Sequence, residues 1–234
     1  MKIIITGASR GIGYDTAYLL ATQGGHEVLA LSRNEKRLSE LADAIEKQSA
    51  DHPLRFLPFD LIQPDFPALK VAVEALGGVD ILINNAGLLI NKRFAELTPD
   101  DWQRSFHVNM FGPVELIRFA LPWLKKSDHA HIVNISSMGG FQGSAKFPGL
   151  SAYSASKAAL SNLTECLAEE LKEEGIKVNC LALGAVDTEM LQEAFPGMEP
   201  PVSSAQMAEY LIHFAMTAHR FYNGKVLPVS VSTP

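Results

Sequence analysis

The chain has 234 residues, of which 47% are hydrophobic and 20% are charged, so it is long enough for one large α/β domain with a full core. The 20 Lys and Arg residues against 26 Asp and Glu residues give a net charge of −6, which argues against a nucleic-acid-binding surface. No apolar run approaches the roughly 20 residues of a membrane span, and the opening run is too short for a signal-peptide core. We therefore expect a soluble, cytoplasmic protein with no nucleic-acid or membrane partner.

Short β-branched runs alternate with longer amphipathic segments along the chain. The pattern predicts strands over residues 2–6, 27–31, 54–59, 80–83, 130–135, 176–182 and 225–229. It predicts helices over residues 12–23, 35–48, 66–76, 101–124, 152–174 and 204–216. Such alternation implies parallel strands joined by right-handed crossover helices. The predicted fold class is α/β, with a Rossmann-type doubly wound parallel sheet of about seven strands, helices on both faces and a single domain over residues 1–234.

A glycine-rich turn directly follows the first predicted strand. Residues 6–13 read Thr-Gly-Ala-Ser-Arg-Gly-Ile-Gly, and a helical pattern begins within this turn. Glycines let the backbone approach a pyrophosphate closely, and the N-terminus of a helix offers unpaired N–H groups to that anion. We expect a dinucleotide to contact the turn through Gly7, Ser9, Arg10, Gly11, Ile12 and Gly13.

The end of the second predicted strand bears on which dinucleotide binds. A ribose 2′-hydroxyl favours a nearby carboxylate, whereas a 2′-phosphate favours a cation. Here Ser32 and Arg33 close the strand, and Arg10 in the turn can reach the same space. Two guanidinium groups suit a phosphate, so the sequence predicts NADP(H) in preference to NAD(H). The alternative is that both arginines are solvated surface residues.

A tyrosine and a lysine open the predicted helix over residues 152–174. Tyr153 and Lys157 are four residues apart and therefore share one helix face. A phenol with a pKa of about 10 is a poor acid–base group at neutral pH, and a nearby ammonium lowers that pKa. Such a pair is often only structural, but its position downstream of a dinucleotide turn favours proton exchange with a carbonyl or alcohol oxygen.

The Thr-Gly-x-x-x-Gly-x-Gly turn and the Tyr-x-x-x-Lys pair together resemble the single-domain branch of the short-chain dehydrogenase/reductase family. The resemblance extends to Asn-Asn-Ala-Gly at 84–87 and to Gly-Ala-Val-Asp-Thr at 184–188, and it spans residues 3–229. It implies an oxidoreductase of the carbonyl reductase or alcohol dehydrogenase type, with no metal. The further cofactor contacts that it implies are Asp60, Leu61, Asn85, Ala86, Gly87, Tyr153, Lys157, Gly184, Val186 and Thr188.

The resemblance also implies a catalytic set of four side chains. Tyr153 would act as general acid and base, and Lys157 would hold the cofactor ribose and lower the pKa of Tyr153. Ser137 would hydrogen-bond the substrate oxygen, and Asn109, at a helix irregularity, would hold a water connected to the lysine. Ser137 stands 16 residues before Tyr153, a longer spacing than the family commonly has, and we place the extra residues within 143–147.

The expected substrate is a small carbonyl or alcohol compound of apolar character, enclosed partly by a loop over residues 189–204. The candidate wall residues are Leu89, Phe94, Met138, Phe141, Phe147, Met190, Phe195 and Met198. The resemblance also implies a homodimer or homotetramer.

Two other functions compete with this interpretation. One is a non-catalytic dinucleotide-binding sensor or scaffold on the same fold; the intact catalytic set argues against it. The other is a sugar-nucleotide epimerase or dehydratase, which needs a larger C-terminal domain than the 46 residues after Thr188 provide.

Overall fold

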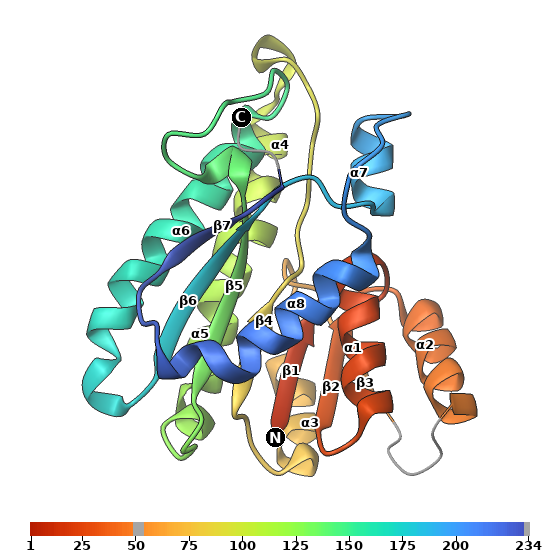
Figure 1. The fold of residues 1–234 in the computed structure, drawn as a ribbon, viewed down its shortest axis with the longest axis vertical. Coiled ribbons are helices and arrows are strands. Elements are labelled where there is room, and N and C mark those ends of the chain that lie inside the picture. Colours follow the sequence, from red (N-terminus) through yellow and green to blue (C-terminus); the bar gives the residue numbers. More distant parts are fainter. Residues whose placement is uncertain (49–53, 232–234) are drawn as a thin grey trace.

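The computed structural model describes residues 1–48 and 54–231, and these form an α/β fold around one seven-stranded sheet (Figure 1). The order across the sheet is β3-β2-β1-β4-β5-β6-β7, and all neighbouring strands are parallel. The strands are β1 (Lys2–Thr6), β2 (Glu27–Ser32), β3 (Arg55–Pro58), β4 (Ile81–Asn84), β5 (His131–Ser137), β6 (Lys177–Leu183) and β7 (Val226–Val229). The predicted doubly wound parallel sheet is confirmed.

Helices cover both faces of the sheet. One face packs against α1 (Gly11–Gln23), α2 (Glu35–Gln48) and α8 (Ser204–Thr217), and the other packs against α3 (Phe66–Leu76), α5 (Gly112–Leu124) and α6 (Ser151–Glu170). Within β1, Ile3 and Ile5 belong to the first of these cores and Ile4 to the second. Because successive strand residues point to opposite faces, burial on both sides explains the nearly continuous apolar strands.

The predicted helix over residues 101–124 is interrupted. It forms α4 (Pro99–Phe106), a π-helical turn η2 (His107–Phe111) and α5, and Asn109 lies within the π turn. Pro113 has no N–H to donate to the carbonyl four residues earlier, so the regular α-helical bonding pattern cannot continue there. The predicted helix over 152–174 similarly ends at Glu170, and a 3₁₀ turn, η4 (Lys172–Glu174), follows.

The expected loop over residues 189–204 contains a short helix, α7 (Glu189–Ala194), that the sequence reading missed. The Thr188 side chain caps this helix by accepting a hydrogen bond from the Leu191 amide at 3.3 Å. The ends of the segment meet where the Asp187 amide donates to the carbonyl of Val202 at 2.8 Å. The segment therefore forms a loop whose two ends lie close together, and α7 lies beside the carboxyl edge of the sheet (Figure 1).

The remaining short elements are the 3₁₀ turns η1 (Phe94–Glu96), η3 (Met138–Gly140) and η5 (Ala218–Arg220). Within the described residues, none of the helices has the length and apolar character needed to span a bilayer. The same residues hold no group of three or more His, Cys, Asp or Glu side chains arranged to bind a metal ion.

His131 is a fully buried histidine at the start of β5. Its Nδ1 lies 2.8 Å from the carbonyl oxygen of Ala215, and its Nε2 lies 3.1 Å from the side-chain amide nitrogen of Asn179. A neutral ring that carries its proton on Nδ1 satisfies both neighbours. Burial lowers the pKa of His131 to about 4.

We predict that His131 makes the protein less stable in mild acid. Between pH 6.5 and pH 4 the unfolded chain binds a proton at this ring and the folded chain does not, so the free energy of unfolding falls as the pH falls. Relative to a His131→Gln variant, the wild type should lose about 2 to 3 kcal/mol between pH 7 and pH 4.5 in urea titrations. The exposed control His213→Gln should keep the wild-type pH dependence. Equal pH slopes in the wild type and His131→Gln would contradict this assignment.

Candidate active site

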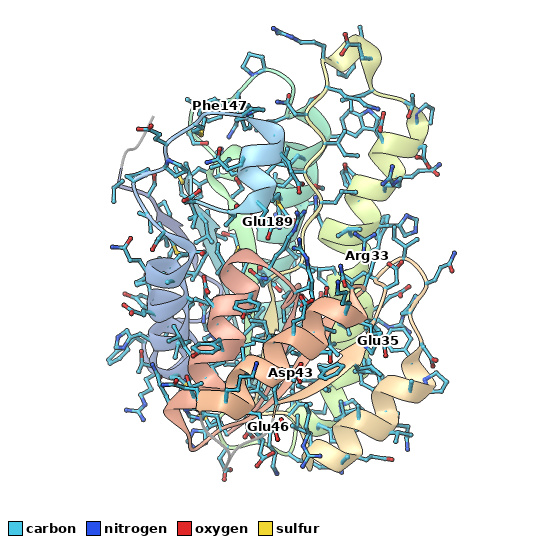
Figure 2. All side chains as sticks on the ribbon, turned by 90° about the vertical axis from the view of Figure 1, so that its right-hand side faces the viewer. Arg33, Glu35, Asp43, Glu46, Phe147 and Glu189 are labelled. Carbon is cyan, nitrogen blue, oxygen red and sulfur yellow. The ribbon has the colours of Figure 1, made fainter. Side chains whose placement is uncertain are left out.

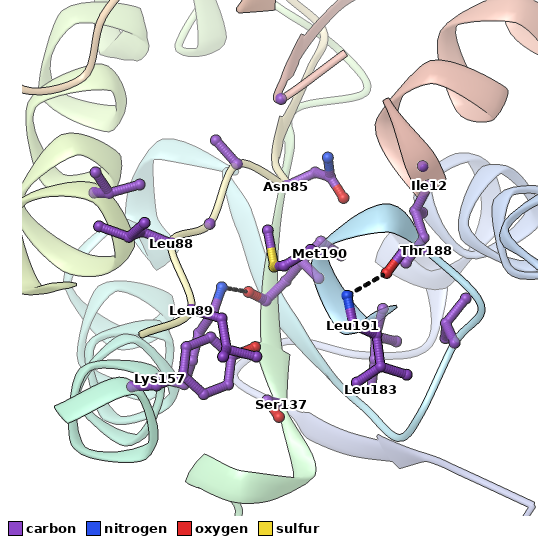
Figure 3. Close-up of a pocket in the computed structure, with 18 of the residues that line it drawn as sticks. Ile12, Asn85, Leu88, Leu89, Ser137, Lys157, Leu183, Thr188, Met190 and Leu191 are labelled. Atoms are coloured by element: carbon purple, nitrogen blue, oxygen red, sulfur yellow. Dashed lines mark hydrogen bonds between the residues drawn. The ribbon is translucent and has the colours of Figure 1, made fainter. Parts of the chain in front are cut away.

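A cleft of about 370 Å³ opens at the carboxyl ends of the strands. It lies where β1 and β4 are neighbours, which is the point at which the order of strands along the chain reverses. In open parallel sheets, ligands bind at this switch point. Figure 3 shows Leu88 and Lys157 on one side of the cleft, Ile12 and Thr188 on the other, and Met190 between them.

Hydrogen bonds to Thr6 join the glycine-rich turn to the segment after β4. The Thr6 hydroxyl accepts from the backbone amides of Asn85 at 3.0 Å and Ala86 at 2.9 Å. The Asn85 side chain donates to the Thr6 carbonyl at 2.9 Å. These three bonds fix the separation of the two chain segments that flank the cleft.

Gly13 serves this packing and is not among the residues that line the cleft, so its expected contact with the cofactor stays a prediction. A Cβ at Gly13 would lie 2.3 Å from the carbonyl oxygen of Gly7 and 2.5 Å from Nδ2 of Asn85. Only a residue without a side chain allows this close approach of helix and turn. Gly11 differs, since it lines the cleft with a φ of 56°.

The residues present fit a dinucleotide. The residue before α1, Arg10, makes no side-chain cap on that helix, and the first turn of α1 has no acidic residue. The N-terminus of α1 thus directs its positive end and its first amides toward the cleft without a carboxylate in that turn. The predicted cofactor residues that line the cleft are Gly7, Ser9, Arg10, Gly11, Ile12, Arg33, Asp60, Leu61, Asn85, Ala86, Gly87, Tyr153, Lys157, Gly184, Val186 and Thr188.

Ser137 and Tyr153 meet within the cleft. Ser137 ends β5 and Tyr153 lies in the first turn of α6, and the long loop between them leaves their side chains within hydrogen-bonding reach. Burial raises the pKa of the Tyr153 phenol above its ordinary value, and the hydrogen bond with Ser137 opposes that shift. The neighbouring Ser136 hydroxyl instead donates to the carbonyl of Lys157 at 2.9 Å, so its bonding is structural.

Lys157 is a buried ammonium, only 3% exposed, and its Nζ donates to the carbonyl of Ile135 at 2.7 Å (Figure 3). Nζ lies 5.9 Å from the centroid of the Tyr153 ring. Burial lowers the pKa of Lys157 to about 8. The expected lowering of the Tyr153 pKa is not found, because in this arrangement desolvation of the phenol outweighs the favourable interactions.

Asn109 lies behind the cleft and is fully buried. Its side chain accepts from the Leu88 amide at 2.8 Å, and donates to the Leu88 carbonyl and the Ser156 hydroxyl, both at 2.9 Å. The side chain therefore braces the segment after β4 against α6, next to Lys157. The expected water-holding role of Asn109 stays a prediction, since its amide oxygen accepts only the one bond from Leu88 and can accept another.

One part of the cleft has an apolar wall. Of the eight expected wall residues, Phe94 and Phe141 do not line the cleft; the Phe94 ring is 74% exposed and lies against Trp102. The apolar wall residues are Leu88, Leu89, Met138, Phe147, Leu150, Met190, Leu191, Phe195 and Met198.

A second hollow adjoins the cleft, and three arginines line it: Arg10, Arg33 and Arg37. Arg33 makes no hydrogen bond or ion pair with any residue that the structure describes. Arg10 and Arg37, in contrast, are paired with Glu189 and Glu193 of α7. The sequence analysis did not predict a role for Arg37 or for either glutamate. The one usable signal was that Arg37 follows Arg33 by four residues, which places both arginines near the start of α2.

The family model for short chain dehydrogenases matches residues 1–199. The chain belongs to the short-chain dehydrogenase/reductase family. It is therefore an oxidoreductase family member, as the sequence resemblance indicated. An uncharacterized oxidoreductase of Staphylococcus aureus (strain MW2) is 30% identical over 212 residues, which cover 90% of this chain and 88% of that protein.

Two solved structures of this family bind different nicotinamide cofactors. A short chain dehydrogenase from Shigella flexneri, complexed with NADP, has a TM-score of 0.86 at 29% identity and covers 97% of this chain and 95% of its own. A 3-ketoacyl-(acyl-carrier-protein) reductase from Brucella melitensis, complexed with NADH, has a TM-score of 0.83 at 26% identity and covers 97% and 96%. This chain is similar to both, so the fold alone does not decide between the cofactors.

We predict that Gly13→Ala destabilises the protein by about 1 to 3 kcal/mol and weakens dinucleotide binding. The added methyl group must push α1 away from the turn at Gly7. Gly25→Ala is the control: Gly25 has a φ of 76° with nothing within 4 Å of its added Cβ, so it tests backbone strain alone. Urea titration and calorimetric titration with NADP⁺ measure both effects. Unchanged NADP⁺ affinity in Gly13→Ala would show that this packing does not shape the cleft.

Proposed function

We propose that the protein is an NADP(H)-dependent oxidoreductase that interconverts a carbonyl compound and an alcohol, with Tyr153 as the general acid and base. The observation that carries this proposal is the meeting of two hydroxyls, those of Ser137 and Tyr153, beside the buried ammonium of Lys157. A protein that only binds a dinucleotide has no need to bury a lysine, because removing an ammonium group from water costs free energy.

The two hydroxyls would act together on the substrate oxygen. Both can donate a hydrogen bond to a carbonyl oxygen placed between them, and this stabilises the negative charge that develops there during reduction. NADPH, when bound, supplies the hydride. Tyr153 then gives its proton to the oxygen, and the Lys157 ammonium favours the phenolate that remains. In the reverse direction the phenolate takes the proton from the alcohol.

The preference for NADP(H) is supported by Arg33. Its guanidinium lines both the cleft and the hollow at the end of α2, and it has no partner among the described residues. Ser9 and Ser32 line the same hollow, with the Ser32 hydroxyl donating to that of Ser9 at 2.8 Å. A phosphate would gain charge-assisted hydrogen bonds from Arg33 that a ribose hydroxyl cannot provide.

The substrate class follows from the far end of the cleft. Among the residues that the structure describes, the charged side chains that line the cleft are Arg10, Arg33, Asp60, Arg104, Lys157 and Glu189. Of these, Lys157 places its Nζ 5.9 Å from the centroid of the Tyr153 ring, and the apolar wall is built from leucine, methionine and phenylalanine. A small, neutral and largely apolar ketone or aldehyde suits such a wall, because a charged substrate would lose its hydration without gaining a partner.

We predict that Tyr153→Phe lowers turnover at least about 10³-fold while NADP⁺ still binds with near wild-type affinity. The variant removes only the hydroxyl and keeps the ring. Turnover is followed by NADPH oxidation with whichever member of a panel of ketones, aldehydes and diketones the wild type reduces fastest, and binding is measured by calorimetry. Tyr14→Phe, in α1 and outside the cleft lining, is the control and should keep full activity. Retained turnover in Tyr153→Phe would remove this residue as the acid.

We predict that Arg33→Ala weakens the binding of NADP⁺ by about 10- to 100-fold and leaves that of NAD⁺ within about twofold. The variant removes charge-assisted hydrogen bonds that only the 2′-phosphate can accept. Calorimetric titrations with both cofactors measure the ratio of the two dissociation constants. An unchanged ratio would overturn the proposed preference for NADP(H).

A further inference from the structure

The guanidinium of Arg10 is held by two carboxylates of α7. Its Nη1 and Nη2 atoms donate to the two oxygens of Glu193 at 2.5 and 3.2 Å, and Nη1 also lies 3.4 Å from Oε2 of Glu189. Glu189 in turn accepts two bonds from Nη1 of Arg37, at 3.1 and 2.9 Å. The hydrogen bonds from Arg37 and Arg10 hold the pKa of the Glu189 carboxyl below its ordinary value.

These ion pairs stand where the 2′-phosphate is expected. The hollow that contains Arg33 is also lined by Arg10, Arg37, Glu189 and Glu193. Figure 2 shows Glu189 and Arg33 near the middle of the molecule, well away from Glu46 at the far end of α2. A phosphate and the two carboxylates are all anions, so they compete for the same guanidinium groups.

The opposite side of α7 forms part of the apolar wall of the cleft. Met190, Leu191 and Phe195 all line it, and the Ala194 carbonyl at the end of α7 accepts a hydrogen bond from the Asn91 side chain at 2.8 Å. Glu189 and Glu193 are four residues apart and share one helix face. Because α7 has only six residues, a change in the contacts of the two glutamates also shifts the apolar side chains that α7 contributes to the wall.

We propose that Glu189 and Glu193 form an anionic latch that determines cofactor specificity. The two carboxylates bind Arg10 and Arg37 until a 2′-phosphate displaces the carboxylates from these arginines. This displacement releases α7. The inference rests on the proposed use of NADP(H). A phosphate monoester carries a charge of about −1.5 to −2 at neutral pH and outcompetes a single carboxylate. A cofactor without the 2′-phosphate has no group that takes over the arginines, so it leaves α7 latched. The latch thus links the identity of the cofactor to the position of the substrate wall.

The ligands that test the latch are adenosine 2′,5′-bisphosphate and AMP, which differ only in the 2′-phosphate. Their dissociation constants are measured by calorimetry for the wild type, Glu193→Gln and the double variant Glu189→Gln/Glu193→Gln. The amides keep the size of the side chains and remove the competing charges. Glu46→Gln is the matched control, an exposed glutamate of α2 outside the hollow.

The double variant should bind the bisphosphate about tenfold more tightly than the wild type does, because each exposed ion pair that no longer competes contributes up to about one factor of five. Its affinity for AMP, and both affinities of Glu46→Gln, should change by less than about twofold. An unchanged or weakened affinity for the bisphosphate, or an equal gain for AMP, would overturn the latch.

Hydrogen exchange of the wild-type α7 amides gives a second readout. The bisphosphate should speed their exchange and AMP should not, whereas in the double variant exchange should already be fast without ligand. Protection of α7 by the bisphosphate would contradict the release. A different result would contradict the proposed preference for NADP(H). In that case the wild type would bind the bisphosphate and AMP with equal affinity, independently of the results for the glutamate variants.

Discussion

The whole site depends on the join between β1 and β4. Three hydrogen bonds tie Thr6 to Asn85 and Ala86, and they hold the glycine-rich turn against the segment that follows β4. This is where the sheet reverses its strand order, so the helices that follow β1 and β4 pack on opposite faces and leave a crevice at the strand ends. Gly7 and Gly13 are required because a Cβ at either would meet this join at 2.8 Å or less. The cleft is the space that such close packing leaves at the strand ends.

The polar groups beyond this join are costly to bury and are held by specific partners. The Nζ of Lys157 donates to the Ile135 carbonyl, and Asn109 is bonded on both sides by Leu88 and Ser156. The lowered pKa of Lys157 and the raised pKa of Tyr153 have one common cause, the removal of both side chains from water. Perturbed groups of this kind cluster at functional sites, since folding alone gains nothing from them.

Most of the fold and the centre of the site could be predicted from the sequence, because strand periodicity, the spaced glycines and the Tyr-x-x-x-Lys pair are local patterns. The features that were missed depend on distant contacts. Arg10 and Glu193 are 183 residues apart in the chain, and the role of Gly13 depends on Asn85. The π turn at Asn109 and the six-residue helix α7 are too short for periodicity to reveal them, although the capping residue Thr188 was a usable signal.

The central claim is that a hydride passes between a nicotinamide and a carbonyl carbon in this cleft. The most direct test supplies the wild-type protein with NADPH that carries deuterium at both C4 positions, together with a small apolar ketone, and examines the alcohol by mass spectrometry. The account predicts an alcohol with one deuterium, bound to the carbinol carbon. Consumption of the ketone without deuterium in the product, or no alcohol from any ketone or aldehyde although NADPH binds, would contradict it.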